Sequence, residues 1–282
     1  MDLTPQHNAE APPQPPRISL VIVSHNRQEM LRPCLESVER QEDRATLQVI
    51  VVDNGSTDGS AQLDSSFPNV QWIRLPKNFG LTKAWNVGWR AADAAYVFFL
   101  HADTELDPAA SVRLAEALDQ HAEAAAVCPL LVDAEGRPAP QLGNLPPDGH
   151  WRPAEVPPAP IPVQYPTGAA LMVRLFNIKA IRQIDEHYGQ FGADADLATQ
   201  ILRANKKILL VPGARVRHHG RPEPLSSLER ADMALGRSVY LSKYAGHMAG
   251  LKARVATVLG ALVTLRLGEF QHEVSGRKID GT

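Results

Sequence analysis

Residues 97–106, "VFFLHADTEL", decide the fold and raise the question of function. Four apolar residues, 97–100, are followed at once by His101, Asp103 and Glu105. A buried strand that ends in metal-binding side chains is a common way to build a site at a sheet edge, but ordinary turns begin in the same way. The sequence on either side has to decide between these two interpretations.

The preceding segments repeat the same design. Val- and Ile-rich runs at 18–23, 47–53 and 70–74 predict strands that are buried on both faces of a sheet. Between them, apolar residues recur at helical spacing at 30–38, and a helix is expected within "KNFGLTKAWNVGWRAAD", residues 77–93. This alternation of strands and helices predicts an α/β fold, with a mostly parallel sheet flanked by helices.

Polar side chains gather where the predicted strands end. Ligands of such sheets bind outside the carboxyl ends of the strands, where the connecting loops converge. One polar cluster at a strand end could arise by chance, but four in register predict a site. The four clusters are His25/Asn26, Asp53/Asn54/Ser56/Asp58, Asn78/Gly80 and His101/Asp103/Glu105.

Composition narrows the class of protein. The chain has 282 residues and a formal net charge of −2, so nucleic acid is not an expected partner. Cys34 and Cys128 lack CxxC spacing and are expected to be buried thiols in a reducing compartment. The first residues, 1–16, are rich in proline and resemble a flexible leader, not a signal peptide.

The second half of the chain is organised differently. Residues 138–166 are crowded with prolines, and so long an irregular segment is expected to cover or shape a site. From residue 226 to residue 282 the sequence is mostly helical in pattern. We therefore expect one catalytic domain over 17–225 and a C-terminal helical extension over 226–282.

Seven motifs in order resemble family 2 glycosyltransferases, which have the Rossmann-like GT-A fold. They are "ISLVIVSHNR", "VIVVDNGSTDGS", "NFGLTKAWNVG", "FFLHADTEL", "GAALMVR", "DEHYGQFGADADLATQILRANKK" and "ARVRHHG". The resemblance covers roughly residues 17–222, and it is greatest to the rhamnosyltransferase-like branch, whose usual "NPDT" corresponds to "HADT" here. Each motif alone is weak, but their common order is specific.

The resemblance implies transfer of a sugar from a nucleotide diphosphate donor to a hydroxyl of a glycan or of a lipid-linked acceptor, with inversion of the anomeric centre. Rhamnose is one candidate for this sugar. The resemblance also implies a divalent cation, Mg²⁺ or Mn²⁺, that stabilises the leaving diphosphate. Asp103 matches the position of the metal-binding carboxylate, and His218 matches the histidine that completes the metal site. Asp194 matches the catalytic base, with Asp196 as second choice.

The donor side of the site follows from the same motifs. Asp53 matches the residue that hydrogen-bonds the nucleotide base, although "DNGS" is equally good chemistry for an Asx turn. Asp58 is expected to cap a helix, and Asn86 and Gly88 to hold helix packing. The other expected donor-binding residues are Ser24, His25, Asn26, Asn78, Gly80 and His101.

Two positions depart from the family's pattern. His101 replaces the more usual Asp or Asn, and because imidazole suits Mg²⁺ poorly, Asp103 is expected to be the only direct ligand from this motif, with His101 in support. Ala193 replaces the more usual Glu, so Asp194 lacks a paired carboxylate and its pKa should be raised less than in a paired site. In "ARVRHH" the two histidines point to opposite faces, and His219 is expected to be a bystander.

Two other classes of protein are alternatives to an active glycosyltransferase. A catalytically impaired sugar-nucleotide-binding or scaffolding relative would explain the departures at His101 and Ala193. A nucleotidyltransferase is disfavoured, because "VIVSHNRQEM" lacks the glycine-rich loop that such enzymes carry after the first strand. The sequence does not specify the sugar, the nucleotide or the acceptor.

The C-terminal extension also has two interpretations. It is expected to form a lid on the catalytic domain or a homodimer contact, or to hold a cytoplasmic enzyme at the inner face of a membrane. Its longest apolar run, 255–265, would rise only ~16 Å as a helix and is too short to span a bilayer.

Overall fold

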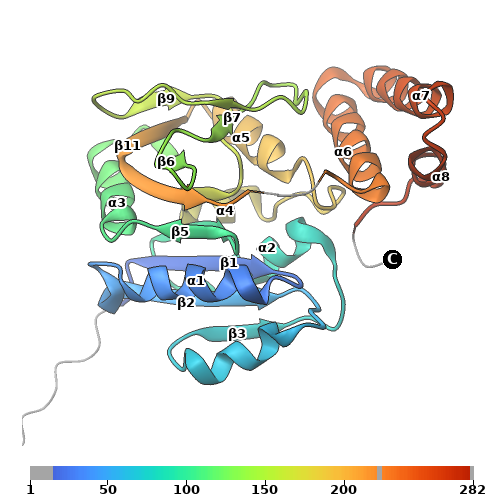
Figure 1. Cartoon of the computed structure of the whole chain (residues 1–282). Coiled ribbons are helices and arrows are strands. Elements are labelled where there is room, and N and C mark those ends of the chain that lie inside the picture. The colour runs from blue at the N-terminus through green and yellow to red at the C-terminus, as the bar shows by residue number, and fades with distance from the viewer. Residues whose placement is uncertain (1–14, 221–223, 280–282) are drawn as a thin grey trace, which may run out of the picture.

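A computed structural model describes residues 15–220 and 224–279 of the chain (Figure 1). Most of the expected leader, 1–16, therefore lies outside the described residues. The strands are β1 (Ile18–Ser24), β2 (Leu47–Asp53), β3 (Gln71–Arg74), β4 (Tyr96–His101), β5 (Thr104–Leu106), β6 (Ala124–Val132), β7 (Pro140–Leu142), β8 (Arg152–Pro153), β9 (Ile161–Val163), β10 (Ala170–Arg174) and β11 (Lys207–His218). The helices are α1 (Gln28–Glu39), α2 (Gly80–Arg90), α3 (Ala110–Gln120), α4 (Leu175–Ile181), α5 (Ala193–Arg203), α6 (Ser227–Ala245), α7 (His247–Val263) and α8 (Leu267–Ser275), with 3₁₀ turns η1 (Arg44–Thr46) and η2 (Gly59–Ser66).

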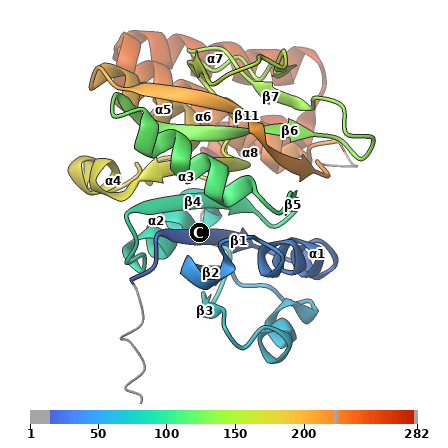
Figure 2. The same cartoon turned by 90° about the vertical axis from the view of Figure 1, so that its left-hand side faces the viewer.

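The main sheet has the strand order β3-β2-β1-β4-β10-β6-β11-β5, and β9 pairs with β11. The first four strands run parallel, β10 is antiparallel to both of its neighbours, and β11 is again parallel to β6. Figure 2 shows the strands stacked in this order from β3 at the bottom to β11 near the top. The prediction of a mostly parallel sheet is confirmed.

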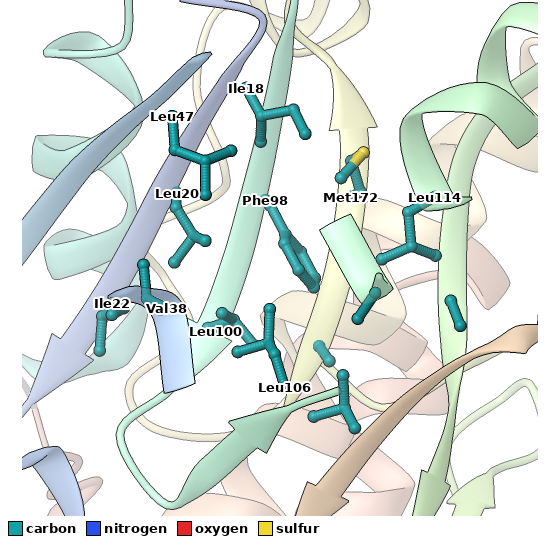
Figure 3. Close-up of a cluster of buried hydrophobic side chains, with 14 of the residues drawn as sticks. Ile18, Leu20, Ile22, Val38, Leu47, Phe98, Leu100, Leu106, Leu114 and Met172 are labelled. Carbon is teal, nitrogen blue, oxygen red and sulfur yellow. The ribbon is translucent and has the colours of Figure 1, made fainter. Parts of the chain in front are cut away.

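Helices cover both faces of this sheet. On one face Val38 of α1 and Leu114 of α3 belong to the same buried cluster as Phe98 and Met172, and all four are fully buried (Figure 3). On the other face Trp85 of α2 packs with Phe99 of β4, with ring centroids 4.9 Å apart, among residues of α4 and α5. Because strands buried on both faces need apolar residues at every position, the sequence shows runs of Val, Ile and Phe without alternation.

Burial explains the behaviour of both cysteines. Cys34 and Cys128 are free, lie in different core clusters, and are at most 1% exposed. Desolvation raises the pKa of each thiol to about 12, so neither is a reactive thiolate near neutral pH. The expectation of buried, unpaired thiols is confirmed.

The helical pattern of the C-terminal extension is also confirmed. Ser226 caps α6, and its side chain and that of Glu229 form a capping box. Helix α8 is tied back to α6 by an ion pair of 2.6 Å between Arg230 Nε and Glu269 Oε2. In Figure 1 these helices stand beside the carboxyl ends of the central strands, so the extension borders the edge where a site is expected.

Helix α2 approaches the sheet closely at one glycine, as the sequence analysis expected. A Cβ atom at Gly88 would collide with Cγ1 of Val21 on β1 and crowd Cγ2 of Val52 at 3.2 Å. Asn86, two residues earlier in α2, donates to Ile184 O at 2.7 Å and holds the segment before α5. Gly88 and Asn86 therefore stabilise the packing of α2 and do not face the site.

We predict that Gly88→Val lowers the free energy of unfolding by about 2–3 kcal/mol, because the added side chain overpacks the contact between α2 and β1. Urea denaturation monitored by circular dichroism would measure the change. Gly260→Ala in α7 is the matched control, since a Cβ atom there meets nothing within 4 Å. Equal destabilisation by both substitutions would contradict the proposed collision.

Candidate active site

A cavity of about 920 Å³ opens at the carboxyl edge of the sheet. Its inner wall includes strand-end residues His25, His101, Asp103 and His218. Residues of the proline-rich segment and of helices α5 to α8 complete the other walls. The structure therefore brings the predicted strand-end clusters and the C-terminal extension together around one space.

Strand pairing assembles a possible metal site in this cavity. Strands β5 and β11 are antiparallel with His218 opposite Thr104, and His219 N donates to Asp103 O at 3.0 Å. Asp103 Oδ1 consequently lies 3.5 Å from His218 Nε2 and 4.0 Å from His101 Nδ1. One ligand atom from each of these three residues lies within 4.8 Å of the other two.

The electrostatics of Asp103 favour a bound cation. Burial tends to raise its pKa, but contact with His218 and the charges of His101 and Arg27 lower the pKa to about 2. The carboxylate is therefore ionised at any physiological pH. Its Oδ1 atom is buried and has no hydrogen-bond donor in good geometry among the described residues, so it is suited to coordinate an ion.

The two adjacent histidines separate as expected. His218 faces Asp103, whereas His219 Nε2 lies 2.6 Å from Glu105 Oε1 on the same antiparallel pair of strands. The side chain of Glu105 is 23% exposed and also lies 3.9 Å from Arg217 Nη1. The pair of Glu105 and His219 links β5 to the end of β11, beside His101, Asp103 and His218.

Asn78 and Gly80 lie in a loop held by an amide network. Asn54 Nδ2 donates to Asn78 Oδ1 at 2.9 Å and to Gly80 O at 3.1 Å. Gly80 N donates back to Asn78 Oδ1 at 2.9 Å, and its φ of +80° suits glycine. Asn54 and Asn78 both line the cavity, so the network fixes a polar part of its wall.

The residues at the end of β1 and directly after it, 24–26, differ in how they relate to the cavity. His25 lines the cavity, and the Ser24 hydroxyl is buried without a hydrogen-bond partner among the described residues. Asn26 has a φ of +49° and its side chain accepts from Thr57 N at 2.8 Å, so it holds two loops together. Direct contact between Asn26 and the sugar-nucleotide donor thus stays a prediction, whereas its role in joining two loops is already visible.

Asp53 adopts the Asx turn that the sequence analysis left open. Its Oδ1 accepts from Ser56 N at 3.0 Å, and the residue is 3% exposed at the end of β2. It is absent from the described residues that line the cavity, so its contact with a nucleotide base stays a prediction. Asp58 caps η2 through Ser60 N, as expected of a cap.

Asp194 lines the cavity from the first turn of α5. Its carboxylate accepts from Tyr165 Oη at 3.0 Å, from Gly168 N at 3.2 Å and from Ala195 N at 2.8 Å. Burial raises the pKa of Asp194 despite these hydrogen bonds, which lower it. A half-buried carboxylate with a raised pKa is suited to accept a proton.

Asp196, the second choice of base, is absent from the described residues that line the cavity, so a catalytic role for it stays a prediction. The residue is fully buried, with its carboxylate 2.8 Å from Lys243 Nζ and accepting from Tyr244 Oη at 2.7 Å. Gln200 Nε2 donates to its other oxygen at 2.7 Å. These contacts join α5 to α6, so a structural role for Asp196 is already visible.

Several residues that line the cavity were not expected from the sequence. Arg27, directly before α1, faces Asp103, and Trp151 and Tyr165 come from the proline-rich segment, with ring centroids 4.9 Å apart. Arg237 of α6 lines the outer part of the cavity. The available signals were the aromatic residues within a proline-rich stretch and the Arg next to the "SHN" turn.

We predict that Asp196→Ala lowers the free energy of unfolding by about 2–3 kcal/mol, because it leaves Lys243 and Tyr244 without their buried acceptor. Asp185→Ala, which removes the more exposed partner of Lys243, should cost about 1 kcal/mol or less. Urea titrations of both variants would measure this. Loss of turnover in Asp196→Ala without loss of stability would instead support a catalytic role.

Comparison with known proteins identifies the family of this chain. The family described as glycosyl transferase family 2 matches residues 19–177, more than half of the chain. An N-acetylglucosaminyl-diphospho-decaprenol L-rhamnosyltransferase of Mycobacterium tuberculosis is 27% identical over 233 residues, which are 72% of this chain and 76% of that protein. A teichoic acid poly(glycerol phosphate) polymerase of Staphylococcus epidermidis is 32% identical over 95 residues, 32% of this chain and 13% of the polymerase.

Solved structures share the fold. GalNAc-T7 with UDP, GalNAc and Mn²⁺ matches with a TM-score of 0.68 at 17% identity, over 81% of this chain and 48% of that one. S. aureus TarS 1-349 in complex with UDP-GlcNAc matches with a TM-score of 0.60 at 17% identity, over 80% of this chain and 66% of that one. The sheet with flanking helices is thus the GT-A fold, and the chain is a glycosyltransferase that belongs to glycosyl transferase family 2.

Proposed function

We propose that the cavity binds a nucleotide diphosphate sugar with a divalent cation and transfers the sugar, with inversion, to a hydroxyl of a glycan or lipid-linked acceptor. The observation that carries this proposal is the position of Asp103 and His218, 3.5 Å apart, in the same cavity as Asp194. A cation-binding pair and a carboxylate of raised pKa are the two components that such a displacement needs.

The residues fit a metal ion. Asp103 supplies a buried carboxylate oxygen, and His101 and His218 supply imidazole nitrogens. Two nitrogen ligands favour Mn²⁺ over Mg²⁺, since Mg²⁺ prefers oxygen ligands. When bound, the cation would neutralise the negative charge that develops on the leaving diphosphate. His101 is therefore proposed as a ligand, a larger role than the sequence analysis expected.

Residues of the chain carry the transfer itself. Asp194 is proposed to accept the proton of the acceptor hydroxyl while the acceptor oxygen bonds to the anomeric carbon. The bond between that carbon and the diphosphate oxygen breaks, and its electron pair leaves with the nucleoside diphosphate. A single displacement of this kind inverts the anomeric centre. Tyr165 and the Gly168 amide hold Asp194 in place, and Arg27 would face the departing phosphates.

The acceptor and the sugar are inferred from the mycobacterial relative. Its name combines a lipid-linked diphosphate acceptor with a rhamnosyl donor, which supports a lipid-linked acceptor and possible rhamnose transfer here. No helix among the described residues has both the length and the apolar content needed to cross a membrane. Separately, the lipid-linked acceptor supports a location at the inner face of a membrane, in contact with the lipid.

A binding or scaffolding relative without catalysis is less well supported. His101 lies within the metal-binding group, so its substitution leaves a usable ligand there. Ala193 is buried, and Asp194 keeps its hydrogen bonds without a neighbouring Glu. Neither departure from the family's pattern removes a component of the proposed reaction.

We predict that Asp194→Asn keeps donor affinity but lowers turnover by about 10²–10⁴-fold, because the amide cannot accept the acceptor proton. Release of nucleoside diphosphate in the presence of acceptor would measure turnover, and calorimetry would measure donor binding. Asp93→Asn is the control and should be close to wild type, because Asp93 is exposed and absent from the described residues that line the cavity. Persistent turnover of Asp194→Asn would place the base elsewhere.

We predict that Asp103→Ala abolishes binding of Mn²⁺ at micromolar concentration, because the two imidazoles lose the only carboxylate of the group. Electron paramagnetic resonance of free Mn²⁺ would measure binding directly, without donor or acceptor. Glu105→Gln, whose side chain faces His219, is the matched control and should retain the ion. Equal binding by wild type and Asp103→Ala would contradict the metal site.

A further inference from the structure

Helix α7 is built with its large apolar side chains outward. Gly250 and Ala261 are its buried residues, and they let α7 lie close against α6, where a Cβ atom at Gly250 would approach Ser238 O at 2.6 Å. The large side chains on the other side are between 44% and 79% exposed. We define these as the α7 apolar stripe: Met248, Leu251, Val255, Leu259, Leu262 and Val263.

This arrangement is the reverse of an ordinary surface helix, which buries its large apolar residues and exposes polar ones. The stripe residues recur at intervals of three and four, so they lie on one side of the helix. Leu265 and Leu267, also exposed, extend the surface beyond the helix end. A contiguous apolar surface of this kind indicates a contact partner.

The charge around the stripe is positive. Residues 247–268 contain no Asp or Glu, and Lys252 is exposed within the stripe. Arg266, beside the stripe, is also exposed and lies 3.5 Å from the carboxylate of Glu269, whose side chain is only 9% exposed. An anionic lipid surface complements both the apolar side chains and these cations. A second copy of the chain fits less well, because a two-fold contact through the stripe would bring like charges together. The 17 residues of α7 also form a helix of only ~25 Å, which suits lying in a lipid interface.

We propose that the α7 apolar stripe docks the enzyme on an anionic lipid surface, with α7 lying in the plane of the interface. Figure 1 places α7 at the outer edge of the molecule, beyond α6 as seen from the sheet. The opposite side of the same helix, including Thr257, Ala261 and Thr264, lines the cavity. Docking would therefore set the cavity beside the lipid headgroups. This use of the surface rests on the proposed lipid-linked acceptor, but lipid binding itself does not.

Flotation of the full chain with vesicles tests the proposal. The wild type should float with vesicles of phosphatidylglycerol and phosphatidylcholine, and should bind pure phosphatidylcholine at least about tenfold more weakly. Leu251→Ser/Leu259→Ser should weaken binding to the anionic vesicles by about tenfold or more, because two apolar side chains are lost from the interface. Lys252→Glu should weaken binding most at low ionic strength.

Phe176→Ser is the matched control, since Phe176 is a 61% exposed apolar residue on α4, outside the stripe. It should bind vesicles as the wild type does, and circular dichroism should show all variants folded. Wild type that fails to float with either vesicle overturns the proposal. A dimer that dissociates in Leu251→Ser/Leu259→Ser, without vesicle binding, would assign the stripe to a second copy. Transfer to a soluble acceptor, measured separately, tests the reaction and not the docking.

Discussion

The site depends on the antiparallel pairing of β5 with β11. This short ladder places residue 103, which follows β4, beside residue 218 at the far end of the sheet. Without it, the carboxylate and the imidazole would belong to separate loops. The pair of Glu105 and His219 lies on the other side of the ladder and reinforces the same register. Because a shift of one residue would exchange His218 for His219, register here decides chemistry.

The C-terminal helices are hydrogen-bonded to the segment that leads to the proposed base. Asp232 of α6 accepts from Gln190 N at 2.8 Å and from Phe191 N at 3.2 Å, on the loop that leads to Asp194. Asp196 connects the same region to Lys243 and Tyr244. Two carboxylates, both buried, thus fix the N-terminus of α5 against α6. The division at residues 225 and 226 that the sequence suggests remains a prediction about domains, since the cavity spans it.

Local pattern was sufficient for much of the fold. Runs of Val and Ile revealed the central strands, and the polar residues after them marked the correct sheet edge. The assignment of Asp103, His218 and Asp194 came from resemblance to a family, because residues far apart in sequence carry no spacing signal.

Asp196 shows where pattern alone fails. It lies two residues after Asp194 in the same acidic turn, and only the docking of Lys243 and Tyr244 distinguishes the two carboxylates. Likewise, nothing in the sequence near Arg237 indicated that this residue would border the cavity. Positions that depend on the packing of separate elements required the structure.

Asp232 also accepts from Ile279 N at 3.0 Å, near the end of the described chain, where Ile279 itself lines the cavity. One buried carboxylate therefore holds two separate parts of the cavity wall, residues 190–191 and residue 279. A substitution at Asp232 would release both parts at once, and would change the shape of the cavity without touching any proposed catalytic residue.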